Sequence, residues 1–505
     1  MKVKMMKKRL LYLLIVFCCS SSFAAESSGR PNILFIMADD HTREGISAYG
    51  SWLKDYCKTP NIDRLAKEGM LFTNTFCNNS ICSPSRASIL TGQYSHTNGV
   101  TKLRGKLRPG APMFTKELQK AGYATALVGK WHLMNEPEGY DYHVRVLDQG
   151  TYFNPKLIGS ENLTPKGYSA DVFTDIALKW LDQKRDKTKP FMMSLHFKAV
   201  HSAFECPKRY DALYADETIP EPATLYENVD ASGQPLKKAY LTRLLGPQDS
   251  QTYPTYIKRE HQRGNDELGS LDPIDATGLS DKEIKRVSYQ HLVKRYIRCV
   301  RALDENVGRV LDYLDKNGLA ENTLVIYTGD QGYWLGQHGF YDKRLMYDVS
   351  MAMPLLVRLP GVVKPGTKSD ALCMNIDFPA TMLDAADAPV PDAMQGRSLM
   401  PLLKGEKPAD WRDEVFYAYW ARPAHYGIRT DRYKLIHTPQ ANGWELLDLK
   451  ADPDEMQNQV ANPEYKNVLD EMKTRLEKLV IQTKLDPENL PPNDPFPRKR
   501  RPKKK

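Results

Sequence analysis

Four short, mainly apolar runs, each followed at once by polar or charged residues, constrain the fold of this chain more than any other feature of its sequence. The runs lie at residues 32–37, 124–128, 191–197 and 323–327. Near-continuous apolar runs of this length are typical of strands buried on both faces, as in a parallel sheet covered by helices. Amphipathic patterns between them, including residues 171–183 and 281–316, predict those helices. The sequence therefore predicts an open α/β fold built on a large, mostly parallel sheet flanked by helices.

The polar residues that follow the four runs are expected to lie close together, because ligands in such folds bind outside the carboxyl ends of the strands. These residues are Asp39 and Asp40, then Lys130 and His132, then His201, and finally Asp330 and Gln331. Carboxylate and amide oxygens suit calcium, whereas magnesium requires a tighter, more hydrated octahedron. The sequence therefore predicts a calcium site formed by Asp39, Asp40, Asp330 and Gln331.

The pattern changes after about residue 407. Strand-like pieces at 414–419, 433–436 and 444–447 precede a last helical stretch at 467–482. They predict a small C-terminal α+β subdomain containing an antiparallel sheet, whereas residues 205–280 are expected to form long loops over the large sheet. The predicted division is a signal peptide at 1–25, a catalytic domain at 26–407, the C-terminal subdomain at 408–490 and a basic tail at 491–505.

The N-terminal segment is typical of a secretory signal, because basic residues precede a short apolar run and small residues ending at Ala25. The apolar run, residues 10–17, is too short to span a bilayer. We expect export to the periplasm or beyond the cell, with no stable membrane insertion. Lipid attachment at Cys18 or Cys19 is the alternative, which the bulky Phe17 before Cys18 disfavours.

The net charge of +9 arises from the two ends of the chain. Of the 71 Lys and Arg residues, five lie in residues 1–25 and seven in residues 498–505, which leaves 59 basic against 62 acidic residues in the remainder. A nucleic-acid-binding protein needs a basic face rather than basic ends. The sequence therefore indicates no nucleic-acid partner.

The segment from Ile81 to Gln93 holds a cysteine in a setting that favours an anion. Pro84 fits a first helical turn, so Cys82 is expected at a helix start, where backbone donors and the helix dipole attract negative charge. Arg86, one turn later, can lie beside it. For an isolated cysteine, however, burial beside a helix start is the commoner explanation.

The residue pattern of this segment also resembles that of a known family. Cys82-x-Pro84-Ser85-Arg86 followed by Leu90-Thr91-Gly92 is the signature of formylglycine-dependent (type I) sulfatases, members of the alkaline-phosphatase-like superfamily. The resemblance extends over nearly the whole chain after the signal segment. Further matching residues in family order are Pro31-Asn32-Ile33, Asp39-Asp40, Gly129-Lys130-Trp131-His132, His201, Asp330-Gln331-Gly332 and Lys343. It implies an alkaline-phosphatase-like fold, and a formylglycine-generating maturation enzyme that converts Cys82 to formylglycine.

The resemblance also implies a role for each matching residue. Arg86, Lys130 and His132 would hold the formylglycine hydrate, and His132 would later take the proton whose loss releases sulfate. Calcium would be bound by Asp39, Asp40, Asp330, Gln331 and the modified Cys82. His201, with Lys343, would protonate the departing alcohol. Gln331 departs from the family's usual Asn or His but keeps an amide oxygen.

Two further stretches, residues 332–344 and 425–434, resemble the carbohydrate-active branch of this family. They are most similar to enzymes that remove the 6-O-sulfate of N-acetylglucosamine from heparan- or mucin-type glycans. The implied substrate is a sulfated carbohydrate. We predict substrate contacts at Lys130, His201 and Lys343, and sugar contacts at His338 and His425.

Two alternatives stand beside this interpretation. One is a phosphatase or phosphodiesterase of the same superfold, since fold alone does not determine chemistry. Such an enzyme would usually carry Ser or Thr as its nucleophile and bind two transition metals. The presence of Cys82 and of a single metal cluster disfavours this alternative. A catalytically silent glycan-binding homologue would have no need for the full set of Arg86, Lys130, His132, His201 and Lys343.

Overall fold

The computed structural model describes residues 29–246, 250–262, 272–439 and 443–490. The predicted signal segment, both cysteines considered for lipid attachment and the predicted basic tail therefore lie outside the described residues. Among the helices that are described, none is both long enough and apolar enough to span a bilayer.

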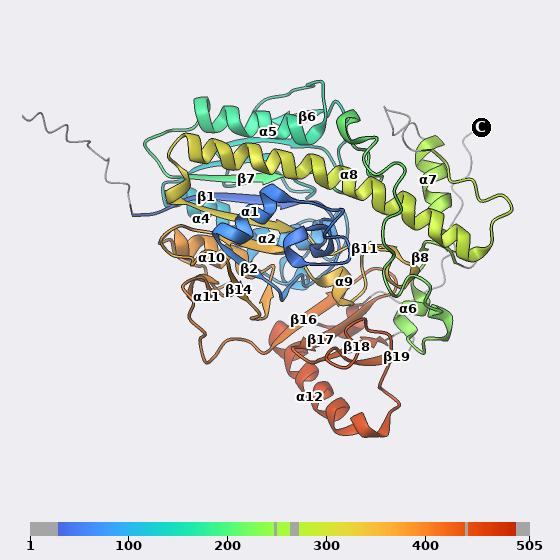
Figure 1. The fold of residues 1–505 in the computed structure, drawn as a ribbon. Helices are drawn as coiled ribbons and strands as arrows, with labels where there is room; N and C mark the ends of the chain where they lie inside the picture. The colour runs from blue at the N-terminus through green and yellow to red at the C-terminus, as the bar shows by residue number, and fades with distance from the viewer. Residues whose placement is uncertain (1–28, 247–249, 263–271, 440–442, 491–505) are drawn as a thin grey trace, which may run out of the picture.

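A nine-stranded sheet forms the central layer of the described part of the chain (Figure 1). Its order is β14 (Thr367–Ser369), β2 (Met70–Phe72), β13 (Leu355–Arg358), β10 (Thr323–Gly329), β1 (Asn32–Ala38), β7 (Phe191–His196), β4 (Ala124–Lys130), β5 (Tyr142–Val146) and β6 (Leu157–Gly159). The five strands from β10 to β5 run parallel, while β13 and β6 pair antiparallel to their neighbours. The four predicted runs are the adjacent strands β10, β1, β7 and β4, which confirms the predicted sheet.

Helices cover both faces of this sheet, which explains why the strands are apolar throughout. In β1, Leu34 and Ile36 pack into one core, and Ile33 and Phe35 into a second core on the opposite face. The first core includes side chains of α1 (Pro60–Glu68), α5 (Ser169–Lys179) and α8 (Asp281–Lys316). The second includes side chains of α2 (Cys82–Thr91), α4 (Phe114–Lys120) and α10 (Asp377–Ala385). Figure 1 shows α5 and α8 on one side of the sheet and α10 on the other.

Shorter elements lie at the rims and in the connections. They are β3 (Thr75–Phe76), α3 (Ser95–Asn98), α6 (Pro235–Ala239), β8 (Thr242–Arg243), β9 (Gln251–Thr252), α7 (Tyr253–Gln262), β11 (Trp334–Leu335), β12 (Tyr341–Asp342), α9 (Asp348–Met351), β15 (Cys373–Met374) and α11 (Met400–Leu403). The region predicted to be long loops thus contains α6 and α7. Helix α7 was not predicted because its composition is mainly polar. Only Tyr253, Ile257 and Glu260 of its ten residues are buried.

The C-terminal part contains the predicted antiparallel sheet, in the order β16 (Glu414–Tyr419), β17 (His425–Thr430), β18 (Tyr433–Thr438) and β19 (Gly443–Asp448). Helix α12 (Lys466–Thr483) packs on one face, against β17 and β18, and its Met472 and Leu476 share a core with Phe416 and Ala418 of β16. The alternate residues of β16, such as Val415 and Tyr417, join the second core of the large sheet. Strand β17 was not predicted. A Cβ at its Gly427 would lie 2.2 Å from the carbonyl oxygen of Leu435, so the close strand approach requires glycine.

A buried charge network joins this C-terminal sheet to the larger part. The Asp348 carboxylate on α9 accepts from Lys434 Nζ at 2.8 Å and from Arg429 Nη2 at 3.0 Å. Lys434 also pairs with Glu455, and its side chain is fully buried. Burial tends to raise the pKa of Asp348, but Arg429 and Lys434 outweigh burial and hold the pKa well below its ordinary value. The network therefore keeps Asp348 ionised inside the junction.

Candidate active site

The polar residues predicted to meet lie at the carboxyl edge of the large sheet. Asp39 follows β1 directly and Asp330 follows β10, and these strands pair in register, Ala38 with Gly329. The backbone N–H of Asp40 donates to Asp330 Oδ1 at 3.0 Å. Lys130 ends β4, next to β7, which leads towards His201. The arrangement follows from parallel strands that end at one edge.

Cys82 is the first residue of α2, after Ile81 in an extended conformation. The whole helix is buried, and Cys82 is 1% exposed. Its Sγ lies 4.0 Å from Asp40 Oδ1 and 3.9 Å from Gln331 Nε2. The helix start thus places the cysteine side chain against the acidic residues of both strand ends.

The Cys82 thiol is a poor nucleophile as it stands. Burial raises its pKa well above the ordinary value, and Asp39 raises it further, although Lys343 and Lys130 act in the opposite direction. A thiol of this kind stays protonated at neutral pH, and the thiolate is the reactive form. In the metal-free site the unmodified thiol is therefore poorly suited to nucleophilic attack at neutral pH.

Three buried carboxylates form the acidic part of the site. Oxygen atoms of Asp39, Asp40 and Asp330 all lie within 4.8 Å of one another. Burial raises the pKa of Asp40 to about 6 and that of Asp330 to about 7, and Asp39 adds to both shifts. Burial also acts on Asp39, but Lys130, His201 and Arg86 offset it and leave the pKa of Asp39 well below its ordinary value. Carboxylates this close are stabilised in their charged form by cations placed beside them.

Gln331 supplies an independent indication of a cation site. Its Nε2 donates to Asp40 Oδ1, whereas its Oε1 is buried and has no hydrogen-bond partner among the described residues. A buried polar atom without a partner is costly and calls for an explanation. An oxygen-preferring divalent cation would be held by this Oε1 and the three carboxylates, so the residues present fit such an ion.

Three basic side chains surround the acidic group. Arg86 donates from Nε to Asp330 Oδ2 at 2.9 Å and from Nη1 to the carbonyl oxygen of Lys130 at 2.8 Å. Lys130 Nζ pairs with Asp39, and Lys343 Nζ donates to Asp40 Oδ1 at 2.7 Å. All three are almost fully buried. These fixed positive charges can stabilise an anion held beside Cys82.

Two histidines complete the cluster, and both are neutral. His201 Nε2 lies 3.7 Å from Asp40 Oδ2, and burial together with Lys343 holds its pKa well below the ordinary value. Burial, and then Lys130, lowers the pKa of His132 to about 2. The carbonyl oxygen of His132 accepts from Ser83 Oγ at 2.7 Å, which ties this residue to the start of α2. Neutral imidazoles beside a reacting group can exchange protons with it.

A pocket of about 190 Å³ opens above the cluster and reaches Cys82, His201 and Lys343. Most residues of its wall were not predicted as site residues from the sequence. The residues missed include Gln149, Tyr256, Arg259, Tyr333, Asp342 and Arg344. Tyr333, Asp342 and Arg344 carried a signal, since they lie in the stretch 332–344 that resembles the carbohydrate-active branch. Arg344 is held by Asp342 Oδ2 at 2.9 Å and donates to Tyr419 Oη of β16 at 3.3 Å.

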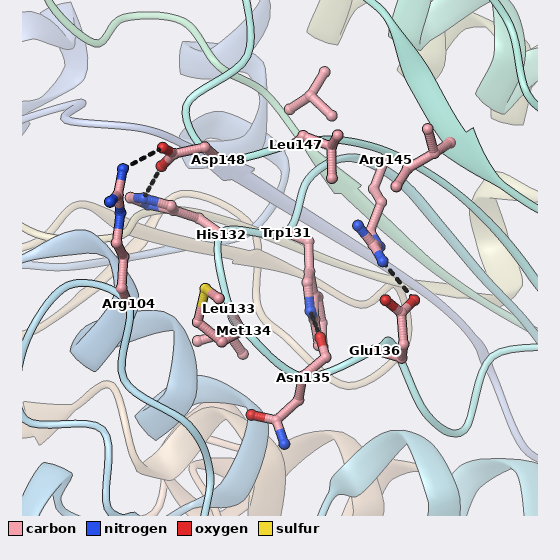
Figure 2. A pocket seen from close by; sticks show the side chains of 12 residues that line it. Arg104, Trp131, His132, Leu133, Met134, Asn135, Glu136, Arg145, Leu147 and Asp148 are labelled. Atoms are coloured by element: carbon pink, nitrogen blue, oxygen red, sulfur yellow. Dashed lines mark hydrogen bonds and ion pairs between the residues drawn. The ribbon is translucent and has the colours of Figure 1, made fainter.

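A second, larger pocket of about 440 Å³ lies on the other side of His132 (Figure 2). It is lined by apolar side chains such as Leu133 and Leu147 and by two ion pairs, Arg104 with Asp148 and Arg145 with Glu136. Leu103 and Gln149 line the smaller pocket, and their chain neighbours Arg104 and Asp148 line the larger one. The two pockets are therefore close to each other, separated by these two chain segments.

The two predicted sugar contacts, His338 and His425, do not line the pocket above Cys82. His425 is fully buried, its Nδ1 is bonded to the Pro423 carbonyl oxygen at 2.7 Å, and its Nε2 accepts from Met346 N at 3.1 Å. It has no ring nitrogen left for a sugar. His338 is 3% exposed, and its Nδ1 is bound by Glu227 and Lys237. It lines another pocket, which shares no lining residue with the pocket above Cys82. Both histidines hold the fold locally.

Comparisons with protein families give two matches. A model described as Sulfatase matches residues 31–388, and one described as N-sulphoglucosamine sulphohydrolase, C-terminal, matches residues 336–482. An N-acetylglucosamine-6-O-sulfatase of Bacteroides thetaiotaomicron is 39% identical over 91% of this chain and 88% of its own length. An N-acetylglucosamine-6-sulfatase of Capra hircus is 29% identical over 78% of this chain and 67% of its own.

Comparisons with solved structures agree. A structure in complex with its substrate, D-glucosamine-2-N,6-O-disulfate, superimposes with a TM-score of 0.79 at 37% identity, covering 91% of this chain and 99% of the other. A phosphonate monoester hydrolase from Silicibacter pomeroyi has a TM-score of 0.72 at 23% identity, covering 90% and 96% of the two chains. The second similarity concerns the fold alone, which hosts more than one chemistry.

Proposed function

Because this chain belongs to the sulfatase family, we propose that it hydrolyses the 6-O-sulfate ester of N-acetylglucosamine, or of a related glucosamine, in a sulfated glycan. The observation that carries the proposal is the 39% identity to an N-acetylglucosamine-6-O-sulfatase along 91% of this chain. The site supports it, because buried cations surround a residue that the family signature marks for modification. We further propose that the protein is exported and matured by a formylglycine-generating enzyme.

Two groups would complete the site. A formylglycine made from Cys82 would supply a nucleophilic oxygen where the thiol lies, and a calcium ion would offset negative charge on the sulfate. Asp39, Asp40, Asp330 and Gln331 would hold the calcium, as their buried oxygen atoms fit a hard divalent ion.

The remaining residues position charge and move protons. Arg86 and Lys130, fixed by Asp330 and Asp39, orient the residue at position 82 and keep a sulfate oxygen in place. His201 and Lys343 line the pocket, so they face the sugar oxygen that leaves. Nδ1 of His201 faces the carbonyl oxygen of Ser202 and carries the proton of the neutral ring, so the imidazole must take up a second proton, on Nε2, before it can neutralise that oxygen. His132 takes a proton from position 82 when sulfate departs. The exclusion of water by complete burial strengthens each of these interactions.

The function is tested with protein co-expressed with a formylglycine-generating enzyme. Mass spectrometry of the peptide covering residues 81–93 should show the loss of the thiol. A panel of sulfated mono- and disaccharides should give sulfate release from 6-O-sulfated N-acetylglucosamine in preference to 2-O-, 3-O- and 4-O-sulfated sugars. Conversion at Cys82 together with turnover of another sugar only would refute the substrate. Turnover of phosphate or phosphonate esters alone would refute the chemistry.

Calcium affinity should depend on pH. Burial raises the pKa of Asp330 to about 7 and the pKa of Asp40 to about 6. Below pH 7 the metal-free site therefore holds a proton on Asp330, and near pH 6 it holds one on part of the Asp40 carboxyl groups as well. Calcium must displace these protons, so affinity should rise between pH 6 and pH 8 by about tenfold or more, with protons released on binding. Calorimetric titration of the metal-free protein in two buffers of different ionisation enthalpy measures both effects.

Gln331→Leu, which removes one neutral ligand, should weaken binding while the pH dependence persists. Affinity independent of pH would contradict this assignment.

A further inference from the structure

A chain of three charged or polar side chains leads from the buried site to the larger pocket. His132 Nε2 lies 3.2 Å from Asp148 Oδ1, and Arg104 Nη2 donates to Asp148 Oδ2 at 3.1 Å. Figure 2 shows Asp148 between the other two side chains at the rim of that pocket. Neither Asp148 nor Arg104 belongs to the family signature, and neither was predicted as a site residue.

The backbone supports this chain of contacts in an unusual way. Arg104, His132 and Asp148 have φ angles of 62°, 57° and 49°, the left-handed region that residues other than glycine rarely occupy. The three residues come from three separate loops. Such conformations persist only where the surrounding structure enforces them, and they gather at functional sites. The left-handed turn at His132 directs its ring from the end of β4 towards Asp148.

The contacts of the His132 ring determine which nitrogen carries the proton. The neutral imidazole has one N–H, and a carboxylate only accepts hydrogen bonds, so the N–H is on Nε2, facing Asp148. Nδ1 is buried and has no partner in the described residues. Its lone pair is therefore free to accept a proton. The link from the His132 carbonyl oxygen to Ser83 Oγ keeps the residue beside position 82.

We propose that Asp148, held by Arg104, is a positioning residue that fixes His132 in the tautomer with its proton on Nε2, so that Nδ1 can act as the base of the sulfatase reaction. The inference rests on the proposed function. When the O–H bond at position 82 breaks, its proton would form an N–H bond at Nδ1, while Nε2 keeps its own proton. The electron pair of the O–H bond would form the carbon–oxygen double bond of the aldehyde as the bond from that carbon to the sulfate oxygen breaks, and sulfate would leave with the electron pair of that second bond. The resulting imidazolium carries one positive charge, which the Asp148 carboxylate offsets. The same arrangement of acid, imidazole and reacting oxygen is general in base catalysis.

Asp148→Asn tests the proposal with little change in shape, because asparagine also tolerates the left-handed conformation. Its amide can donate to Nε2 and thereby favour the wrong tautomer. We expect kcat to fall by about 10- to 100-fold, with KM unchanged, since a half-exposed carboxylate contributes less than a buried one. Arg104→Gln should lower kcat less, by a few-fold. Glu136→Gln, which breaks the other ion pair of the same pocket, is the matched control and should change neither constant.

A second measurement needs no turnover. In ¹⁵N-histidine-labelled protein with Cys82 unconverted, His132 should show the chemical shifts of the Nε2–H tautomer, and Asp148→Asn should move them towards the Nδ1–H tautomer. Wild-type protein that releases no sulfate from any ester would refute the proposed function and leave this measurement intact. Wild-type kcat in Asp148→Asn, a raised KM alone, or an unchanged tautomer would overturn the role of Asp148.

Discussion

Cys82→Ala should abolish sulfate release, lowering turnover by at least about 10⁴-fold, while the protein stays folded. Loss of the nucleophile in covalent catalysis has effects of this order. The fold should survive because the sulfur makes only long contacts, at 4.0 Å with Asp40 Oδ1 and 3.9 Å with Gln331 Nε2. Removing one small buried group costs about 1 kcal/mol of stability. Sulfate measured by ion chromatography, alongside thermal unfolding, separates the two effects.

The chain offers a matched control for this variant. Cys77 is also fully buried, lies five residues earlier in the chain, and has a pKa that burial raises to about 12. Its Sγ lies 3.4 Å from Ser80 Oγ. Cys77→Ala should retain turnover. Equal activity in the two variants, or activity in Cys82→Ala close to that of the wild type, would refute a mechanism based on residue 82.

Lys434→Met should lower the free energy of unfolding by about 3–5 kcal/mol, since it leaves the buried carboxylates of Asp348 and Glu455 without their shared cation. Methionine fills most of the space of the lysine stem, so the loss reflects charge rather than a cavity. Urea unfolding followed by fluorescence and circular dichroism measures the change. Lys466→Met breaks the exposed pair with Asp470 and should leave the unfolding curve unchanged. A Lys434→Met midpoint equal to that of the wild type would show that the network does not stabilise the junction.

The central strands and their polar ends could be predicted because burial on both faces leaves a continuous apolar pattern. Strand ends then fix the meeting point of Asp39, Lys130 and Asp330 without any knowledge of distances. Strand β17 and helix α7 gave no such signal. Gly427 weakened the strand pattern of β17, and few residues of α7 are buried.

The rest of the site depends on loop conformations that residue types do not encode. Asp342, Arg344, His132 and Asp148 all have positive φ without being glycine, so the sequence carries no mark of these turns. The contact of His338 with Glu227 likewise follows a left-handed turn at its own position, which the sequence does not indicate. The burial of His425 is a tertiary property that its neighbours in the sequence do not reveal.

The C-terminal sheet contacts a residue that lines the pocket above Cys82. Tyr417 Oη of β16 donates to the carbonyl oxygen of Arg344 at 2.6 Å and accepts from Ser80 N at 3.2 Å, so one hydroxyl braces both the pocket wall and the segment leading to Cys82. Loss of this sheet would therefore remove one support of both segments at once. A chain that ends before β16 would keep Cys82 but lack the hydroxyl that fixes Ser80 and Arg344.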